Sequence, residues 1–175
     1  MNRTPLRVAV VVGSVREGRF GPTIAGWAAT ETARHAELEA DLVDPVDAAS
    51  VAKRLDVADA FVIVTPEYNH SYPGPLKVLI DDHRAEWQAK PVAFVSYGGL
   101  SGGLRAVEHL RPVLAELHAH TVRDTVSFHG GRQCFGVDGQ PTDPASTAAM
   151  RRMLDGLAWW GSTLREARAL RPYPG

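Results

Sequence analysis

The chain has 175 residues, 45% of them hydrophobic and 22% charged, which is typical of a soluble globular protein. Its net charge is −1 with the histidines counted as neutral, and no run of basic residues is present, so charge gives no reason to expect nucleic acid or an anionic membrane as a partner. One cysteine excludes an internal disulfide, and without an apolar signal-peptide core or membrane span we expect a cytoplasmic protein that binds no metal.

Strand and helix patterns alternate five times along the chain. Short apolar runs predict strands, and apolar residues spaced by three and four predict helices. The expected strands cover residues 6–12, 38–43, 60–64, 91–96 and 121–128. The expected helices cover 22–36, 46–54, 75–87, 104–117 and 144–170, and 129–143 is expected to be a surface loop. This alternation predicts an α/β fold in which helices cover both faces of a parallel sheet.

The length suits five strand–helix units and no more, which favours a single domain over residues 1–175. Residues 170–175 should form a frayed tail, since Pro172 and Pro174 cannot continue a helix. Among the few right-handed topologies we choose the flavodoxin-like, doubly wound, five-stranded sheet with strand order 2-1-3-4-5. In that order the first, third and fourth strands are neighbours, so the loops that follow them meet at the edge where such sheets bind ligands.

The first of these loops, residues 13–21, joins a strand end to a helix N-terminus. Free backbone N–H groups and the helix dipole favour an anion there, and hydroxyl and guanidinium groups add donors. Ser14, Arg16 and Arg19 are predicted to hold a phosphate, and Phe20 and Gly21 are predicted to bind the same ligand. The loop is not a Walker A motif, because Gly18 is followed by Arg19 and Phe20 rather than Lys and Ser or Thr. A polar surface loop with solvated arginines is the alternative.

The second loop, residues 65–74, follows a fully apolar strand. Its backbone amides, the amide of Asn69 and two tyrosines suit a flat heterocycle with donors and acceptors along one edge. The residues predicted to line it are Pro66, Glu67, Tyr68 and Asn69. The alternative is a rigid turn in which Asn69 caps its own backbone. Glu67 could serve as a general base, although nothing in the sequence indicates a raised pKa.

The third loop, residues 96–103, has four glycines in six positions, which permits close approach of the backbone to a planar ring. The residues predicted to contact the ring are Ser96, Tyr97, Gly98, Gly99 and Gly102. A flexible connector is the alternative. The segment 99–103 also fits the loosely defined pattern Gly-x-Ser-x-Gly, so Ser101 with Asp124 and His129 gives a serine hydrolase as another possible function.

Together these segments resemble the NAD(P)H-dependent FMN reductase family of flavodoxin-like flavoproteins. The resemblance covers about residues 6 to 128 and is carried by the segments Gly13-Ser14-Val15-Arg16, Pro66-Glu67-Tyr68-Asn69-His70-Ser71-Tyr72-Pro73-Gly74 and Ser96-Tyr97-Gly98-Gly99. The chain departs from the family pattern twice. Many members have a second serine where Arg19 stands, and many have Asn-Ala where this chain has Val78-Leu79.

The resemblance implies bound FMN, with its phosphate on residues 14–21 and its ring against residues 66–72 and 97–102. It also implies NAD(P)H as co-substrate, and a quinone, azo dye, flavin or metal oxyanion as the second acceptor. Since the flavin carries the hydride, no catalytic side chain is expected. Members are typically homodimers or homotetramers. A flavodoxin-like electron carrier or flavin-binding regulator is the nearest alternative function.

Overall fold

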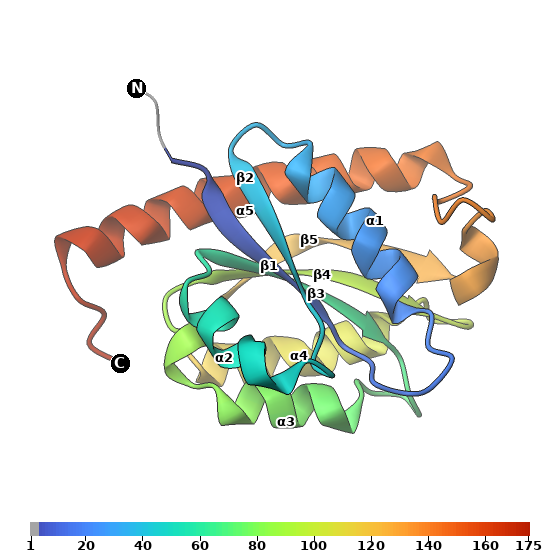
Figure 1. The fold of residues 1–175 in the computed structure, drawn as a ribbon, viewed down its shortest axis with the longest axis horizontal. Coiled ribbons are helices and arrows are strands. Elements are labelled where there is room, and N and C mark those ends of the chain that lie inside the picture. The colour runs from blue at the N-terminus through green and yellow to red at the C-terminus, as the bar shows by residue number, and fades with distance from the viewer. Residues whose placement is uncertain (1–3) are drawn as a thin grey trace.

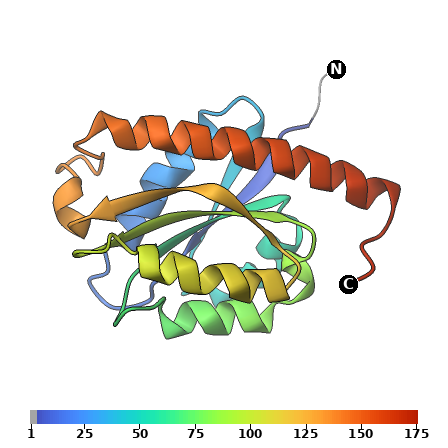
Figure 2. The same ribbon diagram turned by 180° about the vertical axis from the view of Figure 1, so that it is seen from behind.

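A computed structural model describes residues 4–175 and shows one five-stranded sheet between two layers of helices (Figures 1 and 2). The strands are β1 (Leu6–Val12), β2 (Leu38–Val43), β3 (Ala60–Pro66), β4 (Pro91–Gly98) and β5 (His120–His129). The helices are α1 (Gly21–Ala33), α2 (Ala48–Asp56), α3 (Gly74–Asp82), α4 (Leu104–Glu116) and α5 (Pro144–Leu170), with short 3-10 turns at Ala85–Trp87 and Gly131–Cys134.

The sheet has the order β2-β1-β3-β4-β5, and all four strand pairs are parallel. This confirms the expected α/β fold and its strand order. β3 and β4 run two residues further than the apolar pattern predicts, because Pro66 still pairs in register with Tyr97. The strands therefore reach into the second and third loops.

Two apolar layers form because successive side chains of a strand point to opposite faces of the sheet. On one face, Val10 and Val62 pack with residues of α1 and α5, including Ile24 and Leu157. The other face is covered by α2, α3 and α4, whose buried residues contact side chains such as Phe61. Central strands buried on both sides explain why their sequences are continuously apolar rather than alternating.

The helix expected over 22–36 ends at Ala33, and the helix expected over 46–54 covers Ala48–Asp56. Two larger differences concern the core. The helix expected over 75–87 ends at Asp82, and a 3-10 turn carries Trp87 into the core, where its ring lies 4.4 Å from that of Phe61. The segment 129–143 is not only a surface loop. Its Phe135 is buried, with ring centroids 5.4 Å from Phe20 and 4.7 Å from Phe128, so the segment closes the α1/α5 side of the core.

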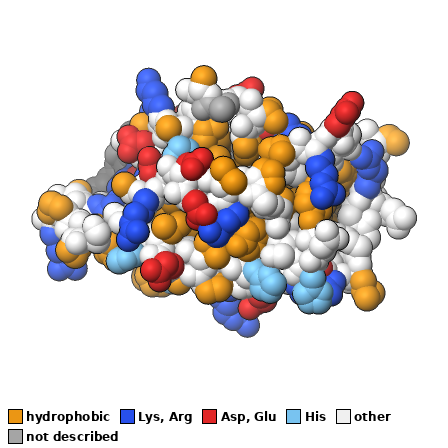
Figure 3. All heavy atoms as spheres, turned by 90° about the horizontal axis from the view of Figure 1, so that it is seen from below, with side chains coloured by type: hydrophobic (Ala, Val, Ile, Leu, Met, Phe, Trp, Pro, Cys, Tyr) orange, Lys and Arg blue, Asp and Glu red, His pale blue; other side chains and the backbone are white. Residues whose placement is uncertain are grey.

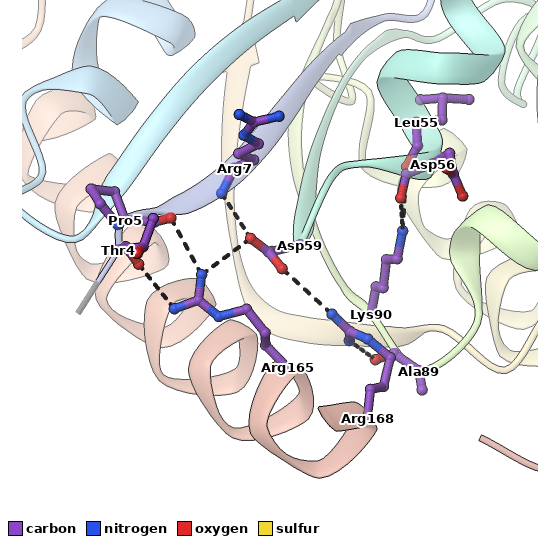
Figure 4. A network of polar contacts seen from close by, with 10 residues as sticks. All are labelled: Thr4, Pro5, Arg7, Leu55, Asp56, Asp59, Ala89, Lys90, Arg165 and Arg168. Carbon is purple, nitrogen blue, oxygen red and sulfur yellow. Dashed lines mark hydrogen bonds and ion pairs between the residues drawn. The ribbon is translucent and has the colours of Figure 1, made fainter. Parts of the chain in front are cut away.

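A network of charged side chains lies at the end of the sheet where the parallel strands begin (Figure 4). The Asp59 carboxylate accepts a hydrogen bond from the backbone N–H of Arg7 (3.1 Å) and meets Arg165 (3.3 Å) and Arg168 (3.6 Å) of α5. Nearby, the Lys90 amine donates to the carbonyl of Asp56 (2.9 Å) at the end of α2. These contacts tie α5 and α2 to the strand starts, at the edge opposite the three loops.

Residues 171–175 leave the helix as expected, and this tail has an anchor. The Tyr173 hydroxyl lies 2.8 Å from Nδ1 of His118. In the part of the chain that the structure describes, no helix combines the length and the apolar character needed to cross a membrane.

Candidate functional site

The three predicted loops lie together at the carboxyl edge of the sheet. The backbone N–H of Gly13 donates to the carbonyl of Val64 (2.8 Å), and that of Glu67 donates to the carbonyl of Tyr97 (3.0 Å). The hydroxyl groups of Ser14 and Tyr97 are 3.3 Å apart. One surface therefore contains parts of the β1, β3 and β4 loops.

The first loop presents free amides around a buried hydroxyl. Ser14 is fully buried, and the backbone N–H groups of 15–18 donate to no backbone carbonyl in residues 4–175. Only glycine fits at the helix start, because a Cβ on Gly21 would lie 2.5 Å from Oγ of Ser14 and 2.9 Å from the hydroxyl of Tyr97. Unpaired donors at a strand-to-helix turn are suited to an anion.

The two arginines of this loop have different surroundings. Both terminal nitrogens of Arg19 meet the Asp44 carboxylate, at 2.9 and 2.7 Å, and Nη1 also donates to the carbonyl of Ser14. The guanidinium of Arg16 lies over the ring of Tyr68, 3.7 Å from its centroid, and forms no ion pair among the described residues. Arg16 is therefore the loop cation whose charge is not neutralised by an acid.

The second loop is a tight turn with two left-handed residues, Asn69 (φ 48°) and His70 (φ 74°). Two backbone hydrogen bonds between Tyr68 and Ser71, at 2.8 and 3.1 Å, close it. Within the described chain the side-chain amide of Asn69 forms no hydrogen bond with a protein group. It therefore does not cap its own backbone and remains available to a ligand.

The contacts of the Glu67 carboxylate argue against a role as general base. It accepts a hydrogen bond from Oγ of Ser101 (2.5 Å) and pairs with Nε of Arg105 (2.7 Å). Burial acts to raise the pKa of Glu67, but the Ser101 hydrogen bond and the charge of Arg105 outweigh it, and the pKa is lowered. A carboxylate stabilised in its charged form is a poor proton acceptor near neutral pH.

The same contacts weaken the hydrolase alternative. Oγ of Ser101 donates a hydrogen bond to Glu67. The His129 ring has other neighbours: its Nδ1 lies 3.0 Å from the carbonyl of Leu100, and its Nε2 lies 3.4 Å from Oγ of Ser127. Among the described residues no contact joins Ser101 to a histidine, so the pattern Gly-x-Ser-x-Gly does not build a nucleophile–base pair here.

In the third loop the Tyr97 side chain is buried beneath the first loop. Burial raises the pKa of Tyr97 to about 12, so its hydroxyl keeps its proton near neutral pH. Gly102 and Gly103 have positive φ angles, and a Cβ on either would lie within 3 Å of other atoms. Gly99 has open space around its Cα, which leaves room for a ligand.

Sequence reasoning missed three side chains at this edge. Asp44 and Arg105 pair with predicted residues, and Arg132 donates to the carbonyl of Gly18 (3.2 Å) while lying 4.9 Å from the ring of Phe20. All three come from segments distant in sequence. The one available signal was position, since Asp44 follows a strand end and Arg105 lies in the first turn of a helix.

A family model described as NADPH-dependent FMN reductase matches residues 6–133, which include all three loops. The chain belongs to this family. Its fold is that of the flavodoxins, as a flavodoxin from the domain Archaea superposes with a TM-score of 0.68 at 14% identity, covering 90% of this chain and 99% of that one.

Several curated proteins have sequences related to this FMN reductase family member. A quinone reductase of Escherichia coli K12 is 30% identical over 189 aligned positions, covering 93% of this chain and 97% of that protein. An NAD(P)H-dependent FMN reductase of Schizosaccharomyces pombe is 33% identical over 120 positions, covering 55% of this chain and 60% of that protein. The match to an NAD(P)H:quinone oxidoreductase of Solanum tuberosum likewise spans 64% of that protein. The chain thus spans less than two thirds of these last two relatives.

Among solved structures, the flavoenzyme FerB, an NAD(P)H:acceptor oxidoreductase from Paracoccus denitrificans, superposes with a TM-score of 0.71 at 23% identity. The match covers 90% of this chain and 98% of that one. It supports the fold of this FMN reductase family member, while the ligand contacts of individual residues stay predictions.

Proposed function

We propose that this protein is an NAD(P)H-dependent FMN reductase-type oxidoreductase that passes electrons to a quinone, a flavin or a similar small acceptor. The observation that carries the proposal is the meeting of the three family loops at one edge, joined by the Ser14–Tyr97 and Glu67–Tyr97 contacts. The family and the printed activities of the relatives support the same reaction class.

The residues present fit a flat ligand with one phosphate. Four backbone N–H groups at 15–18, the Ser14 hydroxyl and the unpaired guanidinium of Arg16 would hold the phosphate. The free Asn69 amide, the backbone of 66–69 and the open space at Gly99 would hold a ring. FMN bound there would supply hydride and electron transfer, and the protein would supply orientation and electrostatics.

Tyr97 and Glu67 then have non-catalytic roles. Tyr97 retains its proton and supports Ser14 under the phosphate side of the site. Glu67 is occupied by Ser101 and Arg105, so it keeps its charge and transfers no proton. This agrees with a reaction that needs no side-chain acid or base.

We also propose a homodimer or homotetramer. An apolar groove of about 690 Å³ lies between the first loop and α3, with Val15, Pro75 and Val78 in its lining, and Val78 is 59% exposed. Figure 3, a view from the side of α3, shows hydrophobic side chains exposed between charged ones. Native mass spectrometry gives subunit number and flavin content together, and a monomer at micromolar concentration would contradict this assembly.

The activity is tested by colour. The purified protein should be yellow, or turn yellow with FMN, and NADH or NADPH should bleach the bound flavin without oxygen. Added quinone should restore the colour over repeated turnovers. Bound FMN that stays oxidised under both nucleotides would instead indicate an electron carrier, and absence of FMN binding would refute the proposed function.

A further inference from the structure

A half-buried ion pair between Glu67 and Arg105 joins the second loop to α4, and the proposed reaction assigns it no part. Glu67, whose side chain is 8% exposed, reaches from the second loop to Ser101 of the third loop and to Arg105 in the first turn of α4. Arg105 also places Nη1 2.8 Å from Nδ1 of His70, in the same turn as Glu67. Arg105 thus holds the second loop at two points.

These contacts act on a segment whose backbone is strained. Asn69 and His70 have left-handed φ angles, which non-glycine residues adopt only when their surroundings fix them. Two further contacts fix the same turn. The backbone N–H of Glu67 donates a hydrogen bond to the carbonyl of Tyr97, and Oγ of Ser71 lies 2.9 Å from Nδ1 of His109 in α4. Side chains of α4 therefore determine where the ring-binding surface of 66–69 lies.

The pair also balances charge. Glu67 is ionised, and its charge is matched by the guanidinium of Arg105 at 2.7 Å. Removal of either partner would leave one unbalanced charge beside the segment that faces the ring: a largely covered carboxylate in one case and a partly exposed guanidinium in the other. An added negative charge there would oppose the addition of electrons to a bound flavin, and an added positive charge would favour it.

We propose that Arg105 and Ser101 are positioning residues that act through Glu67, holding the ring-binding turn 66–72 and neutralising its carboxylate, and thereby set both flavin-ring affinity and the midpoint potential of bound FMN. This inference rests on the proposed function. It assigns Ser101 a hydrogen-bonding role in place of a nucleophilic one, and it adds Arg105 as a residue that tunes the site without serving as a catalytic residue.

The test compares R105M, E67Q, the double variant E67Q/R105M and S101A with the unaltered protein, each loaded with FMN. Spectroelectrochemical titration should show a more negative midpoint potential for R105M and a more positive one for E67Q. The double variant should return close to the unaltered value, because the two charges are removed together. S101A should shift the potential in the same direction as R105M and by less.

Affinity provides the second readout. R105M should bind FMN and riboflavin about tenfold more weakly, and by the same factor for both, because the pair acts on the ring and not on the phosphate. The double variant should lose no more affinity than the weaker-binding single variant, as expected for two residues that act as one unit. Circular dichroism of each apoprotein checks folding, and S101A preserves the test if R105M does not fold.

A matched control is the pair of Asp41 and Arg54, which is also in ion-pair contact but lies on β2 and α2, outside the three loops. D41N and R54M should leave the potential and both affinities unchanged. Unchanged potentials in E67Q and R105M, shifts of the same sign, or a loss of FMN affinity with unchanged riboflavin affinity would each overturn the proposal.

The outcomes separate this inference from the proposed function. If the unaltered protein binds FMN but NAD(P)H does not reduce it, the reductase proposal fails while the potentials still decide the role of the ion pair. If the unaltered protein binds no FMN, both are overturned.

Discussion

Arg19 and Asp44 form a two-point ion pair in which each terminal guanidinium nitrogen meets one carboxylate oxygen, at 2.9 and 2.7 Å. Asp44 follows the end of β2, so the pair attaches the first loop to the strand beside β1. In this chain the arginine is held by an acid, and its contribution is first of all to the shape of the loop.

Asp44→Ala should therefore lower stability. It removes charge-assisted hydrogen bonds from a mostly buried guanidinium, and we expect the free energy of unfolding to fall by about 1–3 kcal/mol. Urea denaturation of the apoprotein measures this. An unchanged denaturation midpoint would show that the pair does not contribute to the folded state.

Arg16→Ala should weaken FMN binding by about 1.5–3 kcal/mol, because a charged hydrogen bond to the phosphate is lost. Riboflavin lacks the phosphate, so its affinity should change little. Arg19→Ala provides the comparison, and its phosphate-specific loss should be smaller because Asp44 already engages that guanidinium. Equal losses of FMN affinity in the two variants would contradict the different roles assigned to Arg16 and Arg19.

Gly21→Ala should be strongly disruptive, since the new Cβ would lie 2.5 Å from Oγ of Ser14 and 2.9 Å from the hydroxyl of Tyr97. We expect a loss of about 1–3 kcal/mol in stability from overpacking, together with weaker FMN binding. Gly26→Ala is the matched control in the same helix. It meets no atom within 4 Å and should stabilise the protein by about 0.5–1 kcal/mol. Melting temperatures that fall equally in both variants would refute the steric argument.

Lys90 should make stability depend on alkaline pH. Burial lowers the pKa of Lys90 from 10.5 to about 8, so above pH 8 the unfolded chain binds more protons than the folded one. Stability should therefore rise with pH between about 8 and 10.5, and the destabilisation from burying the charge is fully present below pH 8. Lys90→Met should abolish this rise.

Urea denaturation at pH 7.5, 8.5 and 9.5 gives the difference in the free energy of unfolding between the unaltered protein and the Lys90→Met variant. Other titrating groups are common to both and cancel. A difference that is constant across the three pH values would mean that Lys90 titrates in the folded state as it does in the unfolded chain.

The fold was accessible from sequence because apolar runs and helical periodicity are local signals. They predicted all five strands, and the chain length with the rule of right-handed crossovers then favoured their order and the edge at which the three loops meet. The break after Asp82 was missed, because Trp87 continues the apolar pattern while its ring turns inward to Phe61. Phe135 was missed for the opposite reason, since its aromatic partners lie on distant elements and its own neighbours are glycine-rich.

The sequence predicted which loops form the site, but it did not predict which charged side chains pair there. Glycines, prolines and the strand-to-helix setting identify loops directly. The partners of Arg19 and Glu67 lie 25 and 34 or more residues away, so only the folded chain could reveal that Asp44 and Arg105 engage them.

The position of the Asp59 network has one further consequence. A strand of seven residues such as β1 spans about 20 Å, so the network lies far from the three loops. The Asp59 carboxylate partly offsets the charges of Arg165 and Arg168, and their combined field at the loop edge is therefore small. Heat tolerance could be altered at that end, by evolution or by an engineer, without retuning the chemistry at the other.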